Sequence, residues 1–192
     1  MAKKQENKKG ILWLLGGATL LFAISRGNGS DSGSGSGSGG GGSASDRPIS
    51  DALLRNAFQV AKSKYGATIA GQAEQLYRKE TRNFDSGQFR KTYTPGMEQA
   101  KGKDEFPYGW GSLNDFLSQY PQYKGEFKLV QMAENTTGIQ KKFVYFPTLE
   151  GAVMFVAYTI NRRGNPGYWR SFDEATAQAY ANSLKSYPIK YT

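Results

Sequence analysis

Apolar residues recur at helical spacing in two consecutive stretches of the chain, and we predict both stretches to be helices. The first begins after Ser50, a residue suited to cap a helix N-terminus, and extends to about residue 65. The second covers about residues 68–83. Their apolar faces carry, in order, Leu53, Leu54, Ala57, Val60 and Ala61, and then Ile69, Ala73, Leu76, Tyr77 and Phe84.

A long irregular segment is expected after these helices. The Pro and Gly content of residues 85–109 argues against regular structure there. A short helix is then predicted to follow Ser112 as its N-cap, with Asp115 completing a capping box, and to stop before Pro121.

The C-terminal part of the chain combines two strands with two further helices. Residues 127–133 and 139–146 are rich in β-forming residues and flank a short polar turn, so they predict a hairpin. Thr148 precedes a nearly all-apolar helix that is expected to be a central buried element, and Ser171 with Glu174 forms a capping box for a last helix ending near residue 187. The pattern predicts an α+β domain over residues 46–192, mostly helical with one small β-hairpin sheet.

The first 45 residues have a different composition. Residues 10–25 carry no charge and follow the lysine-rich segment KKQENKK, which is typical of a membrane anchor or of a cleaved signal peptide within residues 1–26. Residues 27–45 contain nine Gly and seven Ser, as in a flexible tether. A tether is useful between a fixed point and a mobile domain, which favours the retained anchor. The lysines should stay on the cytoplasmic side, so residues 46–192 are expected outside the cytoplasm.

The chain has neither Cys nor His, which excludes several chemistries. Cys–His and Ser–His–Asp nucleophilic sites, disulfides and the usual zinc sites are all impossible. Carboxylate, Tyr, Lys or Ser chemistry remains, as does hard-metal chemistry through oxygen ligands. The net charge of +9, of which +6 belongs to residues 46–192, suits a polyanionic partner such as nucleic acid, anionic lipid or an acidic cell wall. No dense basic stripe or nucleic-acid-binding motif is present, so nucleic acid is not expected.

Glu80 is the most informative candidate for chemistry, because it falls on the apolar stripe of the second helix, near the end of that helix and facing the long loop. A partly desolvated carboxyl group favours its protonated form, and a protonated carboxyl can donate a proton to a leaving glycosidic oxygen. The alternative is a structural Glu80 that pairs with a buried Arg or caps a backbone amide.

The residues around Glu80 resemble a known superfamily. Glu80-Thr81, followed sixteen residues later by Gly96-Met97-Glu98-Gln99, resembles the catalytic Glu-Ser and the Gly-Leu-Met-Gln motif of lytic transglycosylases, with Thr in place of Ser and Glu98 interrupting the second motif. The stretch VYFPTLEGAVMFVAYTI resembles bacterial glucosaminidases. Both belong to the lysozyme-like superfamily, and the similarity covers about residues 68–187. The anchor, the tether and YRKETRNFDSGQF together resemble the cell-wall lytic proteins of bacteriophages.

This resemblance implies a lysozyme-like fold and a membrane-tethered peptidoglycan glycosidase. A lytic transglycosylase would cut between N-acetylmuramic acid and N-acetylglucosamine, with Glu80 acting first as acid and then as base, and it implies no metal and no organic cofactor. A hydrolase would need a second carboxylate. Glu134 at the hairpin tip is the candidate, and its alternative is an ordinary solvated turn residue. A non-catalytic wall-binding or structural virion protein with the same fold remains the competing interpretation.

Aromatic residues crowd the loop after Glu80, and sugar faces pack well on aromatic rings. Some of these rings must pin the loop to the core, and we assign that role to Phe89 and Phe106. The candidate substrate-binding residues are Thr81, Tyr93, Gly96, Met97, Tyr108, Glu134 and Tyr145.

Overall fold

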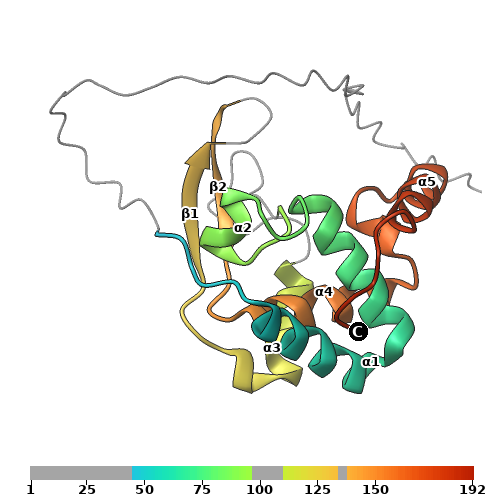
Figure 1. Cartoon of the computed structure of the whole chain (residues 1–192), viewed down its shortest axis with the longest axis horizontal. Coiled ribbons are helices and arrows are strands. Elements are labelled where there is room, and N and C mark those ends of the chain that lie inside the picture. Colours follow the sequence, from blue (N-terminus) through green and yellow to red (C-terminus); the bar gives the residue numbers. More distant parts are fainter. Residues whose placement is uncertain (1–44, 97–109, 134–137) are drawn as a thin grey trace, which may run out of the picture. The chain divides into compact units, whose positions relative to one another are not determined.

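The computed structural model describes residues 45–96, 110–133 and 138–192. Their helices and strands, in chain order, are α1 (Asp51–Glu80), α2 (Gly87–Thr92), α3 (Trp110–Gln119), the 3-10 helix η1 (Pro121–Tyr123), β1 (Lys128–Ala133), β2 (Gln140–Tyr145), α4 (Leu149–Arg163), the 3-10 helix η2 (Pro166–Trp169) and α5 (Glu174–Leu184) (Figure 1). This part of the chain is mostly helical with one small antiparallel sheet, which confirms the predicted class.

The predicted anchor and nearly all of the tether lie outside the described residues. Within the ranges that the structure describes, no helix is both long enough and apolar enough to cross a membrane.

Helix α1 contains the two helices that the apolar pattern predicted. Ser50 caps it as expected, since its hydroxyl accepts a hydrogen bond from the amide of Leu53 at 3.1 Å. Gly66 interrupts it with φ +83° and ψ 164°, a backbone conformation that residues with a side chain rarely adopt. The second half ends at Glu80 rather than near residue 83, because residues 82–84 all adopt positive φ angles.

Helix α4 is the central buried element, as predicted. Thr148 caps it by accepting a hydrogen bond from the amide of Gly151 at 3.1 Å, and every residue from Leu149 to Ile160 except Glu150 is buried. Helix α4 packs against α1 and against α3, where the rings of Phe116 and Phe155 meet edge to face with centroids 5.6 Å apart.

The hairpin was predicted to within one residue at the ends of the strands. Strands β1 and β2 pair antiparallel, with Lys128 opposite Tyr145 and Ala133 opposite Gln140. The turn that includes Glu134 lies outside the described residues.

The predicted loop over residues 85–109 was partly wrong, because it contains α2. Ser86 caps this short helix by accepting a hydrogen bond from the amide of Phe89 at 3.2 Å, and the buried ring of Phe89 fixes it to the core. A six-residue helix is too short to show an apolar period, and tertiary contacts rather than the pattern stabilise it.

Two predicted helix starts were also wrong. Helix α3 begins at Trp110, so Ser112 lies inside it, and the carboxylate of Asp115 pairs with Arg162 at 2.5 Å instead of completing a capping box. Helix α5 begins at Glu174 and ends at Leu184. Its N-cap is Asp173, which accepts a hydrogen bond from the amide of Thr176 at 2.9 Å, whereas the sequence had predicted Ser171 in this role.

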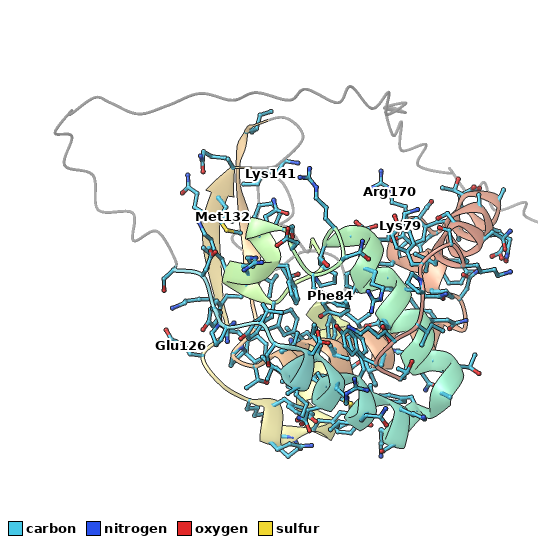
Figure 2. The ribbon with its side chains drawn as sticks, viewed as in Figure 1. Lys79, Phe84, Glu126, Met132, Lys141 and Arg170 are labelled. Carbon is cyan, nitrogen blue, oxygen red and sulfur yellow. The ribbon has the colours of Figure 1, made fainter. Side chains whose placement is uncertain are left out.

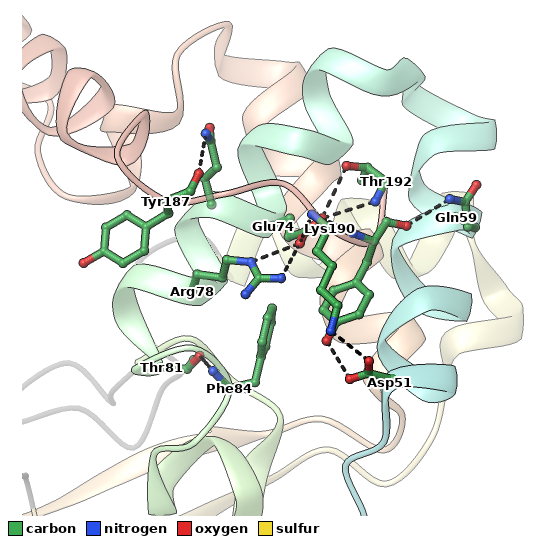
Figure 3. Close-up of polar contacts among 11 residues, drawn as sticks. Asp51, Gln59, Glu74, Arg78, Thr81, Phe84, Tyr187, Lys190 and Thr192 are labelled. Carbon is green, nitrogen blue, oxygen red and sulfur yellow. Dashed lines mark hydrogen bonds and ion pairs between the residues drawn. The ribbon is translucent and has the colours of Figure 1, made fainter.

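The C-terminal segment crosses α1 and is held there by Glu74, whose side chain is fully buried (Figure 3). Its carboxylate accepts hydrogen bonds from the backbone amides of Lys190, Tyr191 and Thr192 at 2.8, 2.9 and 3.2 Å. It also pairs with the guanidinium of Arg78 at 2.7 Å. This carboxylate therefore joins the last residues of the chain to the second half of α1.

Candidate active site

Glu80 is the last residue of α1 and is half-buried, as its place on the apolar stripe predicted. Its Oε1 accepts a hydrogen bond from the hydroxyl of Tyr180, which comes from α5, one hundred residues further along the chain. The end of α1 thus presents a carboxylate whose orientation a second helix fixes.

Tyr180 is only 9% exposed, and its surroundings keep its hydroxyl protonated. Burial first, and then the negative charge of Glu80 and the hydrogen bond to it, raise the pKa of Tyr180 well above its ordinary value. The phenol therefore acts as a constant hydrogen-bond donor to the carboxylate.

Two basic residues accompany this pair and can be located in Figure 2. The ammonium of Lys79 lies 4.7 Å from the centroid of the Tyr180 ring. The charge of Arg170, the residue that follows η2, acts to lower the pKa of Tyr180 against the larger effects above. Positive charge from α1 and from the residue after η2 therefore acts on the phenol that binds Glu80.

The structure uses Thr81 to close the end of α1. Its side chain is 1% exposed, donates a hydrogen bond to the carbonyl of Tyr77 at 2.5 Å and accepts one from the amide of Phe84 at 2.9 Å. The hydroxyl thereby supports the turn over residues 82–84 immediately after Glu80. Its role in substrate binding stays a prediction.

Tyr93 and Tyr145 are brought together, and Arg47 lies against both of them. The guanidinium carbon is 3.6 Å from the ring centroid of Tyr93 and 4.5 Å from that of Tyr145. Arg47 also donates hydrogen bonds to the carbonyls of Phe146, at 2.6 Å, and Pro147, and burial lowers its pKa. The hydroxyl of Tyr93 donates to the carbonyl of Pro48 at 3.1 Å. Tyr93 therefore holds the start of the domain in place, while Tyr145 is half-buried.

The other candidates divide into described and undescribed residues. Gly96 adopts φ +91° with open space around its α-carbon, as a turn requires. Met97, Phe106, Tyr108 and Glu134 lie outside the described residues, and the expectations for them stay predictions. Phe89 is fully buried, which confirms its assignment to the core.

Sequence reasoning missed Tyr180. The spacing of Ala177, Tyr180 and Leu184 marks the buried face of α5, and that signal was available. Nothing in the spacing shows that this face meets the end of α1. Over the described ranges, no group of three acidic side chains is placed to hold a metal ion.

Comparisons with known proteins leave the chain without an assigned family, because no family model, no curated protein and no solved structure matches it.

Proposed function

We propose that this protein is a membrane-tethered peptidoglycan glycosidase with a lysozyme-like fold, and that Glu80 is its catalytic acid. The observation that carries the proposal is the half-buried Glu80 carboxylate at the end of α1, held by the hydroxyl of Tyr180. A carboxyl group in this setting, next to a loop, is what protonation of a glycosidic oxygen requires.

The reaction we propose is that of a lytic transglycosylase. Glu80 donates its proton to the oxygen that links N-acetylmuramic acid to N-acetylglucosamine, and the bond from that oxygen to the anomeric carbon breaks. The resulting carboxylate then takes the proton of the muramic acid 6-hydroxyl as that oxygen bonds to the same carbon. One carboxyl group serves both steps, so the mechanism requires no second acid, metal or organic cofactor.

Three further features support this proposal. The mostly helical part of the chain carries a small antiparallel hairpin, which is compatible with a lysozyme-like architecture. The net charge of +6 over residues 46–192 suits an anionic wall. The composition of residues 1–45 suits an anchor and a tether that hold the domain outside the cytoplasm, at a cell envelope or a virion membrane of a bacteriophage.

The decisive test replaces Glu80 with Gln. The amide keeps the shape of the side chain but cannot donate the proton, so clearing of a gel that contains cell wall should fall by at least ~100-fold. Glu150→Gln is the matched control, because Glu150 is also half-buried and accepts a hydrogen bond from a tyrosine, Tyr123, at 2.8 Å. A Glu80→Gln variant that clears the gel at the rate of the control would contradict the proposal.

The products distinguish a transglycosylase from a hydrolase. Mass spectrometry of the released muropeptides should show anhydro ends, which are lighter than reducing ends by one water. In a transglycosylase, Glu134→Gln should at most weaken substrate binding, whereas in a paired-carboxylate hydrolase it should abolish turnover. Reducing ends together with an inactive Glu134→Gln variant would identify a hydrolase.

A second candidate is a non-catalytic wall-binding or virion protein. It is favoured by the engagement of Thr81 and Tyr93, two of the candidate binding residues, in hydrogen bonds within the fold. A wild-type protein that sediments with purified wall without releasing muropeptides would establish this candidate.

A further inference from the structure

We propose that Tyr180 is the positioning residue of Glu80: its hydroxyl holds one oxygen of the carboxylate and so orients the other oxygen for proton transfer to and from the substrate. This inference rests on the proposed function, because it assigns Tyr180 a role in the reaction that Glu80 performs.

The hydrogen bond between the two side chains has a fixed direction. The hydroxyl of Tyr180 donates, and Oε1 of Glu80 accepts. The rotation of the carboxylate is restricted by the same bond, so its other oxygen has a defined direction.

The ring of Tyr180 is itself held in place by neighbouring side chains. The ammonium of Lys79 lies 4.7 Å from the ring centroid and donates a hydrogen bond to the hydroxyl of Ser183 at 2.5 Å. The Ser183 hydroxyl in turn donates to the backbone carbonyl of Tyr180 at 2.6 Å. Two adjacent residues at the end of α1, Lys79 and Glu80, therefore hold one turn of α5.

Helix α5, which carries Tyr180, has little room to move. Helix α5 packs so closely against η2 that a β-carbon added at Gly167 would lie 1.8 Å from the backbone oxygen of Ala177. Since Ala177 is one turn before Tyr180, this contact fixes the position from which the hydroxyl reaches Glu80.

Tyr180 remains a hydrogen-bond donor because burial, and then the charge of Glu80, raises the pKa of its hydroxyl. Tyr187, beyond α5, adds to this increase, and the charge of Arg170, after η2, acts against it.

The proposal predicts a specific change in the Tyr180→Phe variant. Without the hydroxyl, the carboxylate of Glu80 is free to rotate. The looser orientation lowers kcat about tenfold, the effect of losing one hydrogen bond of ~1.4 kcal/mol in the transition state, whereas KM and the melting temperature change little.

The experiment measures kcat and KM of the full-length protein on soluble wall fragments, together with the melting temperature of each variant. Tyr168→Phe is the matched control, since it removes a hydroxyl that donates to a different carboxylate, that of the exposed Glu174, and it should leave kcat unchanged. Ser183→Ala keeps the Tyr180 hydroxyl but removes the support of its backbone, and kcat should fall about threefold with KM unchanged. If Tyr180→Phe does not fold, Ser183→Ala replaces it, and a wild-type kcat in Ser183→Ala would then overturn the proposal.

The remaining outcomes separate this proposal from the proposed function. A Tyr180→Phe variant with a wild-type kcat overturns the positioning role while Glu80 remains the acid. So does a variant whose lower kcat is accompanied by a raised KM and a lower melting temperature. A wild-type protein that releases no muropeptides overturns the proposed function and this inference with it.

Discussion

At the scale of single residues, the spacing of apolar side chains identified Glu80 but not what surrounds it. Position on a stripe predicts half-burial, and the structure confirms it. The partner of Glu80 is one hundred residues away, a distance at which periodicity gives no information. Glu74 is more deeply buried than Glu80, and its partners are Arg78 and backbone amides near the end of the chain. A hydrophobic pattern describes side chains only, so it could not predict these backbone partners.

Replacing Glu74 with Gln tests whether this buried carboxylate stabilises the fold. The amide cannot accept all the hydrogen bonds from Lys190, Tyr191 and Thr192, and it leaves the guanidinium of Arg78 buried without its counter-charge. The free energy of unfolding should fall by about 3–5 kcal/mol, measured by urea denaturation. Asp85→Asn breaks an exposed pair with Arg90 and should cost less than about 1 kcal/mol. Equal losses in the two variants would contradict the role of Glu74.

A pH-dependent contribution to stability is expected from Asp51. Hydrogen bonds from Lys190, and then from Tyr191, lower the pKa of Asp51 below its ordinary value. Because the folded-state pKa is the lower one, the stabilisation is fully present above the unfolded pKa of about 4 and is lost as the pH falls through the folded pKa. The melting temperatures of wild type and Asp51→Asn should differ most near pH 6, and the difference should shrink below pH 4. A difference that stays constant with pH would contradict this account.

At the scale of elements, the sequence predicted which helices and strands exist more accurately than where they begin. Apolar residues recur at helical spacing in the long helices, and β-forming residues are concentrated in the two strands of the hairpin, so the sequence predicted that these elements exist. The start of α5 was wrong because two capping residues, Ser171 and Asp173, compete within one turn, and the packing of the helix selects between them. The start of α3 at Trp110 was also not predicted.

The packing of η2 against α5 gives a test at this scale. Gly167→Ala would place a β-carbon 1.8 Å from the backbone oxygen of Ala177, so one element must shift, and stability should fall by about 3 kcal/mol. Gly87→Ala is the matched control, because a β-carbon there meets nothing within 4 Å, and it should change stability by less than about 0.5 kcal/mol. Thermal unfolding measures both. A Gly167→Ala variant as stable as Gly87→Ala would show that the two elements do not pack this closely.

At the scale of the whole molecule, composition predicted a domain over residues 46–192, and the structure shows how the start of that domain is held. The predicted tether ends at Ser45, and two residues later Arg47 contacts Tyr93 and Tyr145 and donates hydrogen bonds to the carbonyls after β2. Composition marks where Gly and Ser stop, but it cannot show that the next residues bind elements as distant in sequence as β2.

Two deletions should therefore have different effects on the domain. Removing residues 1–45 deletes the predicted anchor and the Gly/Ser tether. Because the tether that precedes residue 46 has almost no apolar side chain to contribute to a core, the melting temperature should stay within about 2 °C of that of the full-length protein in detergent. Removing residues 1–49 also removes Arg47 and Pro48, whose cation–π contacts and hydrogen bonds are worth about 2 kcal/mol together, a loss of roughly 4–8 °C for a domain of this size. Arg47→Ala in the shorter deletion should reproduce most of that loss. Equal melting temperatures for the two deletions would place the start of the stable domain beyond Arg47.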